Sequence, residues 1–107
     1  MVRTTKQATA NTTFAIGMNG WDPIYLSNAT LVQARAWAWM FLFDRFVESK
    51  GKDTLSAVNV IKFKDKVAKE RVGCVSDYQR STDTATWTNY KTGESFAINS
   101  AGGKVKN

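Results

Sequence analysis

The stretch that decides the fold reads Ala-Trp-Ala-Trp-Met-Phe-Leu-Phe, at positions 36–43. These eight apolar residues lie inside a segment, 29–50, whose length, alanines and polar continuation favour an α-helix. Every second residue from Trp37 to Phe43 is aromatic, which is also typical of a strand, so a strand stays the alternative. We predict one long central helix over 29–50.

This helix carries more apolar side chains than one face can bury. A surface helix normally has a single apolar stripe along its length. Trp37 and Phe41 fall among the polar residues of the opposite face, and Met40 lies on the border. We expect these three residues to be covered by another part of the fold, by a second copy of the chain or by a partner. The expected core stripe consists of Val32, Ala36, Trp39, Leu42, Phe43 and Phe46.

The chain before the helix predicts a short strand at 12–17, with Phe14 and Ile16 on one face. Ser27 or Asn28 is the expected N-cap of the helix, and Gly51 its expected stop. The core stripe of the helix is expected to meet five residues of the strands, Phe14, Ile16, Trp87, Phe96 and Ile98.

After Gly51, Asp53 or Thr54 predicts the cap of a second, shorter helix that runs to Val72. The β-branched content favours a strand at 57–63 as the alternative. A three-stranded antiparallel meander is expected at 75–80, 84–90 and 95–99, with a hairpin turn at 89–94. The predicted fold is therefore α+β, with an N-terminal strand, a long central helix, a second shorter helix and a C-terminal three-stranded antiparallel meander.

Length and composition bound the organisation of the chain. Its 107 residues suit one domain, and we expect a flexible N-terminal arm at 1–11, a compact α+β domain at 12–99 and a flexible basic tail at 100–107. No secretory signal or membrane-spanning run is seen, and Cys74 is the only cysteine. These features predict a cytoplasmic protein without a membrane partner.

The residue inventory argues against catalysis. The chain contains no histidine, which removes the commonest general base and most nucleophile and zinc systems. A lone Cys74 is expected to be a buried structural thiol, and Asp44 and Glu48 to be solvated helix acids. We therefore expect no enzyme activity, no catalytic residues, no metal site and no cofactor.

Basic residues gather between the central helix and the meander. The formal net charge of +6 attracts polyanions, although it also serves solubility. If the second helix forms, Lys62, Lys66 and Lys69 share one of its faces, and such a row can follow a phosphate backbone; a solvated helix face is the alternative. The candidate nucleic-acid-binding residues are Lys50, Lys52, Lys62, Lys64, Lys66, Lys69 and Arg71.

Two hypotheses about function follow. The first is a small non-enzymatic binding protein whose lysine-rich segment engages nucleic acid or a nucleoprotein complex. The second is a phage- or mobile-element-type inhibitor that acts by protein–protein contact, through Trp37, Met40 and Phe41 or as a homodimer. Trp21, beside a turn, either contacts a ligand or closes one end of the core.

Overall fold

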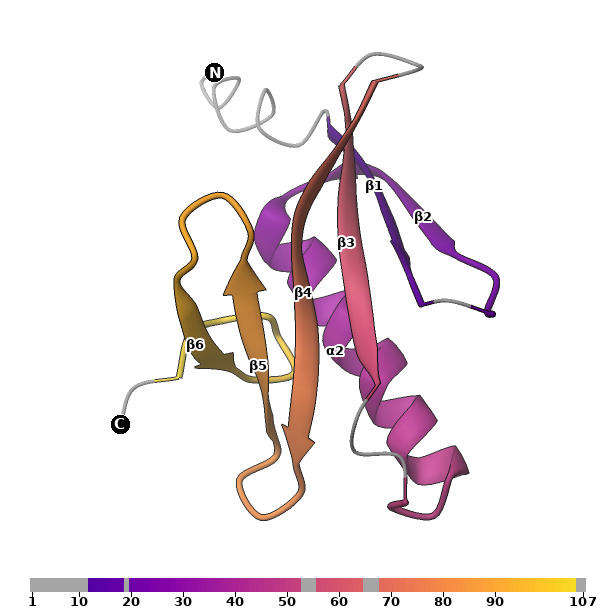
Figure 1. The fold of residues 1–107 in the computed structure, drawn as a ribbon, viewed down its shortest axis with the longest axis vertical. Coiled ribbons are helices and arrows are strands. Elements are labelled where there is room, and N and C mark those ends of the chain that lie inside the picture. The colour runs from indigo at the N-terminus through magenta and orange to yellow at the C-terminus, as the bar shows by residue number, and fades with distance from the viewer. Residues whose placement is uncertain (1–11, 19, 53–55, 65–67, 106–107) are drawn as a thin grey trace, which may run out of the picture.

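The computed structural model describes residues 12–18, 20–52, 56–64 and 68–105. Within these residues the fold is one α-helix and one six-stranded antiparallel sheet, which confirms the α+β class. The strands lie in the order β2-β1-β3-β4-β5-β6, and α2 crosses one face of the sheet behind β3 and β4 (Figure 1). The elements are β1 (Thr12–Gly17), β2 (Ile24–Ala29), α2 (Leu31–Glu48), β3 (Ala57–Lys64), β4 (Ala68–Gln79), β5 (Thr84–Asn89) and β6 (Ser95–Ile98).

The predicted second helix is wrong, and the strand alternative at 57–63 is confirmed. The segment contains β3 and the first five residues of β4, and β3 pairs along its whole length with residues 68–76 of β4. Val58 and Val60 are fully buried, as suits β-branched side chains on a pleated surface. In β4, Val72 is an extra residue, because Val60 pairs with Gly73 while Ile61 pairs with Arg71. β3 carries apolar side chains on both faces, and the bulge breaks the alternation of β4, so neither strand shows a clear two-residue period in the sequence.

The central helix is confirmed, with a start two residues later than predicted. Thr30, not Ser27 or Asn28, is the N-cap, because those two residues belong to strand β2. The Thr30 hydroxyl accepts a hydrogen bond from the Gln33 N–H at 3.2 Å, and the Gln33 amide oxygen accepts one from the Thr30 N–H at 2.9 Å. This capping box satisfies two free donors of the first turn.

The helix ends at Glu48, two residues before the predicted end, and Gly51 takes part in its termination as the sequence predicts. Gly51 has a positive φ of 78°, and its N–H donates to the Phe46 carbonyl at 2.9 Å. Lys50, just before it, also has a positive φ of 58° and donates to the Val47 carbonyl. The two bonds form a Schellman motif, which satisfies carbonyls that the helix leaves without partners.

The core lies between α2 and the sheet, and the helix turns a slightly different stripe toward it than predicted. Ala34, Ala38, Trp39 and Leu42 are buried, whereas Val32 is exposed. The small side chains of the two alanines let the helix approach the sheet closely. The predicted strand partners lie in or against this core, which contains Phe14, Ile16, Trp87 and Ile98, with Phe96 packed beside it.

Tyr78 is a core residue that the sequence analysis did not single out. It is 8% exposed and lies against three rings of the helix, those of Trp39, Phe43 and Phe46, at centroid distances of 5.7, 5.5 and 4.9 Å. Its hydroxyl donates to Asp83 at 2.5 Å. Burial and this hydrogen bond raise the pKa of Tyr78 to about 12.

The structure describes most of the C-terminal end of the chain, whereas the N-terminal end is not described. The predicted N-terminal arm, residues 1–11, lies outside the described residues. Of the predicted C-terminal tail, residues 100–105 are described and return to the domain: Gly102 is buried and its carbonyl accepts from the Arg35 Nε at 2.9 Å. Ile98 also forms a bridge with Lys104. Within the described residues no helix is long and apolar enough to cross a membrane.

Candidate nucleic-acid interface

The two faces of the sheet have different surroundings. One face packs against α2, and the strand register shows which side chains point the other way. We call that other side the open face. Along β1 and β3, residues that point to the open face alternate with the buried residues Phe14, Ile16, Val58 and Val60, which point toward α2. The open-face positions are occupied by Thr13, Ala15 and Gly17 on β1, by Ala57, Asn59, Ile61 and Phe63 on β3, and by Lys69, Arg71, Cys74 and Ser76 on β4.

The bulge at Val72 decides which cations reach the open face. Lys69 pairs with Phe63, and Arg71 pairs with Ile61, so both project from the open face and both are exposed. Lys62 pairs with Phe14 and Glu70, whose side chains lie on the helix side of the sheet. Without the extra residue, Lys69 and Arg71 would share the side of Gly73 and Val75, which faces α2.

The structure therefore divides the basic residues that the sequence grouped together. Lys50 and Lys52 follow α2, whose C-terminal end lies at the opposite end of the molecule from the end of β3 and the start of β4 (Figure 1). Lys66 lies outside the described residues, and for Lys64 only the backbone is described. A single helical row of Lys62, Lys66 and Lys69 does not exist, since the segment is extended.

Aromatic rings accompany the two cations of the open face. Tyr25, on the edge strand β2, stacks with Phe63 at a centroid distance of 6.2 Å and an interplanar angle of 20°. The Lys69 Nζ lies 5.8 Å from the Phe63 ring centre, and the Arg71 guanidinium lies 5.6 Å from that of Tyr90. Tyr25 is 62% exposed and Tyr90 45% exposed. Large aromatic faces are thus accessible beside positive charge.

A small polar group lies between the aromatic residues. The Tyr90 hydroxyl donates to the Asn59 amide oxygen at 3.4 Å, a long hydrogen bond. A hydrogen bond with Cys74, together with burial, raises the pKa of Tyr90. Cys74 is only partly buried, in contrast to the buried thiol that was expected. These contacts keep the Tyr90 ring over the sheet and leave its other side to solvent.

The open face is also hollowed toward the β1–β2 turn. A hollow of about 190 Å³ has Ala15, Gly17, Asn59 and Ile61 as its floor, with Met18, Trp21 and Pro23 around it. No carboxylate occupies the open-face positions of β1, β3 and residues 69–76 of β4. The chemistry of the described open face is therefore cationic and aromatic, with amide and hydroxyl groups between the rings.

The predicted partner-binding residues lie elsewhere, on α2. Trp37 is 49% exposed and Met40 42% exposed, while Phe41 is partly buried. No described part of the fold covers the first two, so the aromatic surplus read from the sequence remains at the surface. All three line a groove between α2 and the start of β2, with a volume of about 310 Å³.

Three aromatic residues of the open face, Tyr25, Phe63 and Tyr90, were not predicted from the sequence. Tyr25 lies in β2, Phe63 in β3, and Tyr90 directly after β5, and only the pairing of these strands through β1 and β4 brings them to one face. A strand assignment for 57–63 would have placed Phe63 and Ile61 on the same side, which was the one available signal.

No group of three or more cysteine, aspartate or glutamate side chains that could hold a metal ion occurs within the described residues. Comparisons of the chain with protein-family models, with curated proteins and with solved structures found no match.

Proposed function

We propose that this chain is a non-enzymatic protein that binds single-stranded nucleic acid on the open face of its sheet. The observation that carries the proposal is the placement of Lys69 and Arg71 on the same face as Tyr25, Phe63 and Tyr90, a face that no helix of the described residues covers. Single strands are bound by such combinations, because cations follow the backbone while bases stack on aromatic rings.

Charge supports a polyanionic ligand on this face. Both cations project to solvent, and the neighbouring open-face positions of β1 and β3 carry no carboxylate that would oppose a phosphate. The lysine contributes a point charge, and the arginine a planar fork that suits bidentate phosphate contacts. The formal net charge of +6 adds a long-range attraction that accelerates encounter.

The aromatic residues favour a single strand over a duplex. A base can stack on Tyr25 or Tyr90 only if it is unstacked from its neighbours, as in single strands. A duplex hides the faces of its bases, so it would contact only the two cations. We therefore expect weaker binding to a duplex of the same length.

The test is a binding titration with a fluorescent oligothymidylate of about 15 nucleotides, at about 50 mM salt and then at rising salt. Lys69→Glu with Arg71→Glu is expected to remove most of the affinity. In the less severe Lys69→Gln variant, the slope of log affinity against log salt should fall by about 0.7, the share of one phosphate contact in a single strand.

The matched control is Lys50→Glu with Lys52→Glu, which reverses the same number of charges beyond the end of α2. If this control lowers the affinity as much as the open-face pair, binding follows net charge alone and the proposed site is wrong. No binding of the unchanged protein at about 50 mM salt would overturn the function itself, because electrostatic affinity is greatest at low salt.

A further inference from the structure

The groove on α2 differs from the open face in shape and charge. It lies between the helix and the segment that leads into the edge strand β2. Its apolar part is formed by Trp21, Ile24, Trp37, Met40 and Phe41, and its polar part by Asp22, Asp44, Arg45 and Glu48. Three of the apolar side chains, Trp21, Trp37 and Met40, are between 42% and 49% exposed.

Exposed side chains of this kind are typical of protein interfaces. Tryptophan, methionine and arginine are enriched where proteins meet, and tryptophan above all contributes large binding energies. Each of these side chains exposes a large apolar area to water. A partner that covers the side chain removes this area from water, which favours binding. Contiguous apolar surface on a monomer therefore indicates a binding site.

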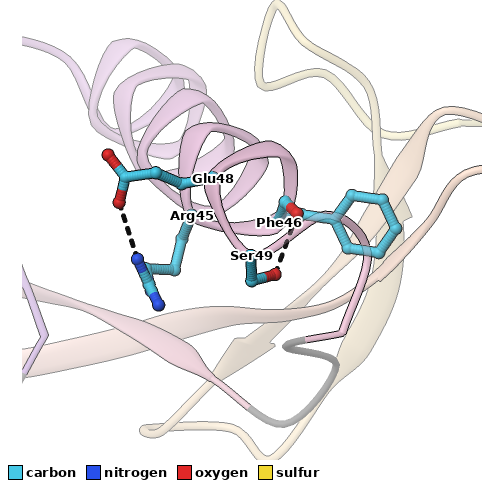
Figure 2. A network of polar contacts seen from close by, with 4 residues as sticks. All are labelled: Arg45, Phe46, Glu48 and Ser49. Atoms are coloured by element: carbon cyan, nitrogen blue, oxygen red, sulfur yellow. Dashed lines mark hydrogen bonds and ion pairs between the residues drawn. The ribbon is translucent and has the colours of Figure 1, made fainter.

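The groove is built before any partner arrives. Arg45 forms an ion pair with Glu48, with 2.7 Å between Nη1 and Oε1 (Figure 2). The same guanidinium lies 4.8 Å from the ring centre of Trp21. Arg45 thus joins the β1–β2 turn to the helix and fixes the ring that forms one wall. A preformed wall lowers the entropy that binding must offset.

The charge of the groove points to the chemistry of its occupant. Three carboxylates and one guanidinium line it, so it is locally negative in a chain with a formal net charge of +6. A nucleic acid would be repelled there. Two copies of the chain that met groove to groove would place Asp22, Asp44 and Glu48 against equivalent carboxylates, since a two-fold interface uses the same patch twice.

We propose that the groove docks a basic segment of another protein, with apolar side chains that cover Trp37 and Met40 and lysines or arginines that face Asp22 and Asp44. This proposal does not rest on nucleic-acid binding, because none of the cations and rings proposed to bind the nucleic acid (Tyr25, Phe63, Lys69, Arg71 and Tyr90) lines the groove. It gives the protein-contact hypothesis a defined surface and a partner of defined charge.

The test uses two synthetic helical peptides with the same pattern of leucines, one with lysines and one with glutamates at all other positions. Binding is measured by fluorescence anisotropy of the labelled peptides. The lysine peptide is expected to bind, and Trp37→Ala to weaken it by about tenfold or more. Asp44→Lys is expected to weaken it as well. Met40→Lys is the second apolar test, in case Trp37→Ala does not fold.

The matched controls lie outside the groove. Val32→Ala changes an apolar residue of the same helix that is 45% exposed, and Glu94→Lys reverses an exposed carboxylate of the β5–β6 turn. Both should leave peptide affinity unchanged. The proposal is overturned if the controls weaken binding equally, if the glutamate peptide binds as tightly, or if neither peptide binds. Light scattering that shows a dimer which Met40→Lys dissociates would assign the groove to a second copy, and would also overturn it.

Discussion

The open face and the α2 groove are both rich in exposed aromatic side chains, yet they differ in the charges beside those rings. On the open face, Lys69 lies over Phe63 and Arg71 over Tyr90. In the groove, the exposed Trp37 is accompanied by Asp44, and the cation over Trp21, Arg45, is paired with Glu48. The formal net charge of the whole chain, +6, therefore does not indicate the local charge of either surface. Within the described residues, one helix packs on one face of a six-stranded sheet, and the other sheet face and the outer side of the helix carry opposite local charge.

The largest expected effect comes from breaking the scaffold that both surfaces share. Trp87 is 1% exposed, and its ring packs over Gly73, where an added Cβ would lie 2.6 Å from it. Trp87→Ala should lower the free energy of unfolding by about 3–5 kcal/mol. Chemical denaturation would measure this loss, and both binding activities should weaken together. Trp37→Ala is the control, because that side chain is half exposed. Equal stability losses in the two variants would contradict the assignment of core and surface.

A smaller effect is expected where one open-face ring is removed. Tyr25→Ala should weaken binding of oligothymidylate by about 1–3 kcal/mol, the contribution of one stacked base. Tyr25→Phe keeps the ring and should keep most of the affinity. Isothermal titration calorimetry measures both variants. If alanine and phenylalanine have the same effect, the ring does not stack on a base, and the cations alone carry the site.

The two sides of the β3–β4 hairpin offer a sharper comparison of charge. Lys62→Gln and Lys69→Gln remove the same charge from neighbouring strands, but only Lys69 projects from the open face. Lys69→Gln should weaken oligothymidylate binding by about the share of one phosphate contact, and Lys62→Gln by much less. The ratio of the two affinities, measured by anisotropy, tests the bulge at Val72 directly. Equal losses would mean that the strand register does not select the cations.

The smallest effect at neutral pH concerns Tyr78, which supports α2 from the sheet. Since folding raises the pKa of Tyr78 to about 12 from 10.0, the folded state favours the protonated phenol. Its contribution to stability is full below pH 10 and is lost as the pH rises from about 10 to about 12. Tyr78→Phe should cost about 1 kcal/mol at neutral pH, and should flatten this decline. Urea unfolding at several alkaline pH values measures it; an unchanged decline would contradict the assignment.

Local signals in the sequence predicted the elements that depend on local chemistry. Gly51 ends the helix and Gly93 has the positive φ of 78° that the β5–β6 turn requires. The apolar surplus at Trp37 and Met40 was visible because helical spacing is set by neighbours in the chain. The second helix was predicted in error for two reasons: β3 carries apolar residues on both faces, and the extra residue Val72 disrupts the alternation of β4. A bulge is defined by the partner strand, which the sequence of one strand does not reveal.

The candidate binding surfaces show the same division. Lys69 and Arg71 were identified from charge, but their grouping with Lys62 failed because pairing, not spacing, sets the face of a strand residue. Tyr25 and Phe63 are neighbours only through β1, which lies between their strands. Long-range pairing of this kind explains why the open-face aromatic residues were not predicted.

The central claim is that the two surfaces bind different ligands, and amide chemical-shift mapping tests it most directly. The ¹⁵N-labelled protein would be titrated with oligothymidylate, and the shifted residues assigned. We expect shifts at Tyr25, Phe63, Lys69, Arg71 and Tyr90 and none at Trp37, Met40 and Asp44. Shifts centred on the α2 groove, or spread evenly over both surfaces, would contradict it.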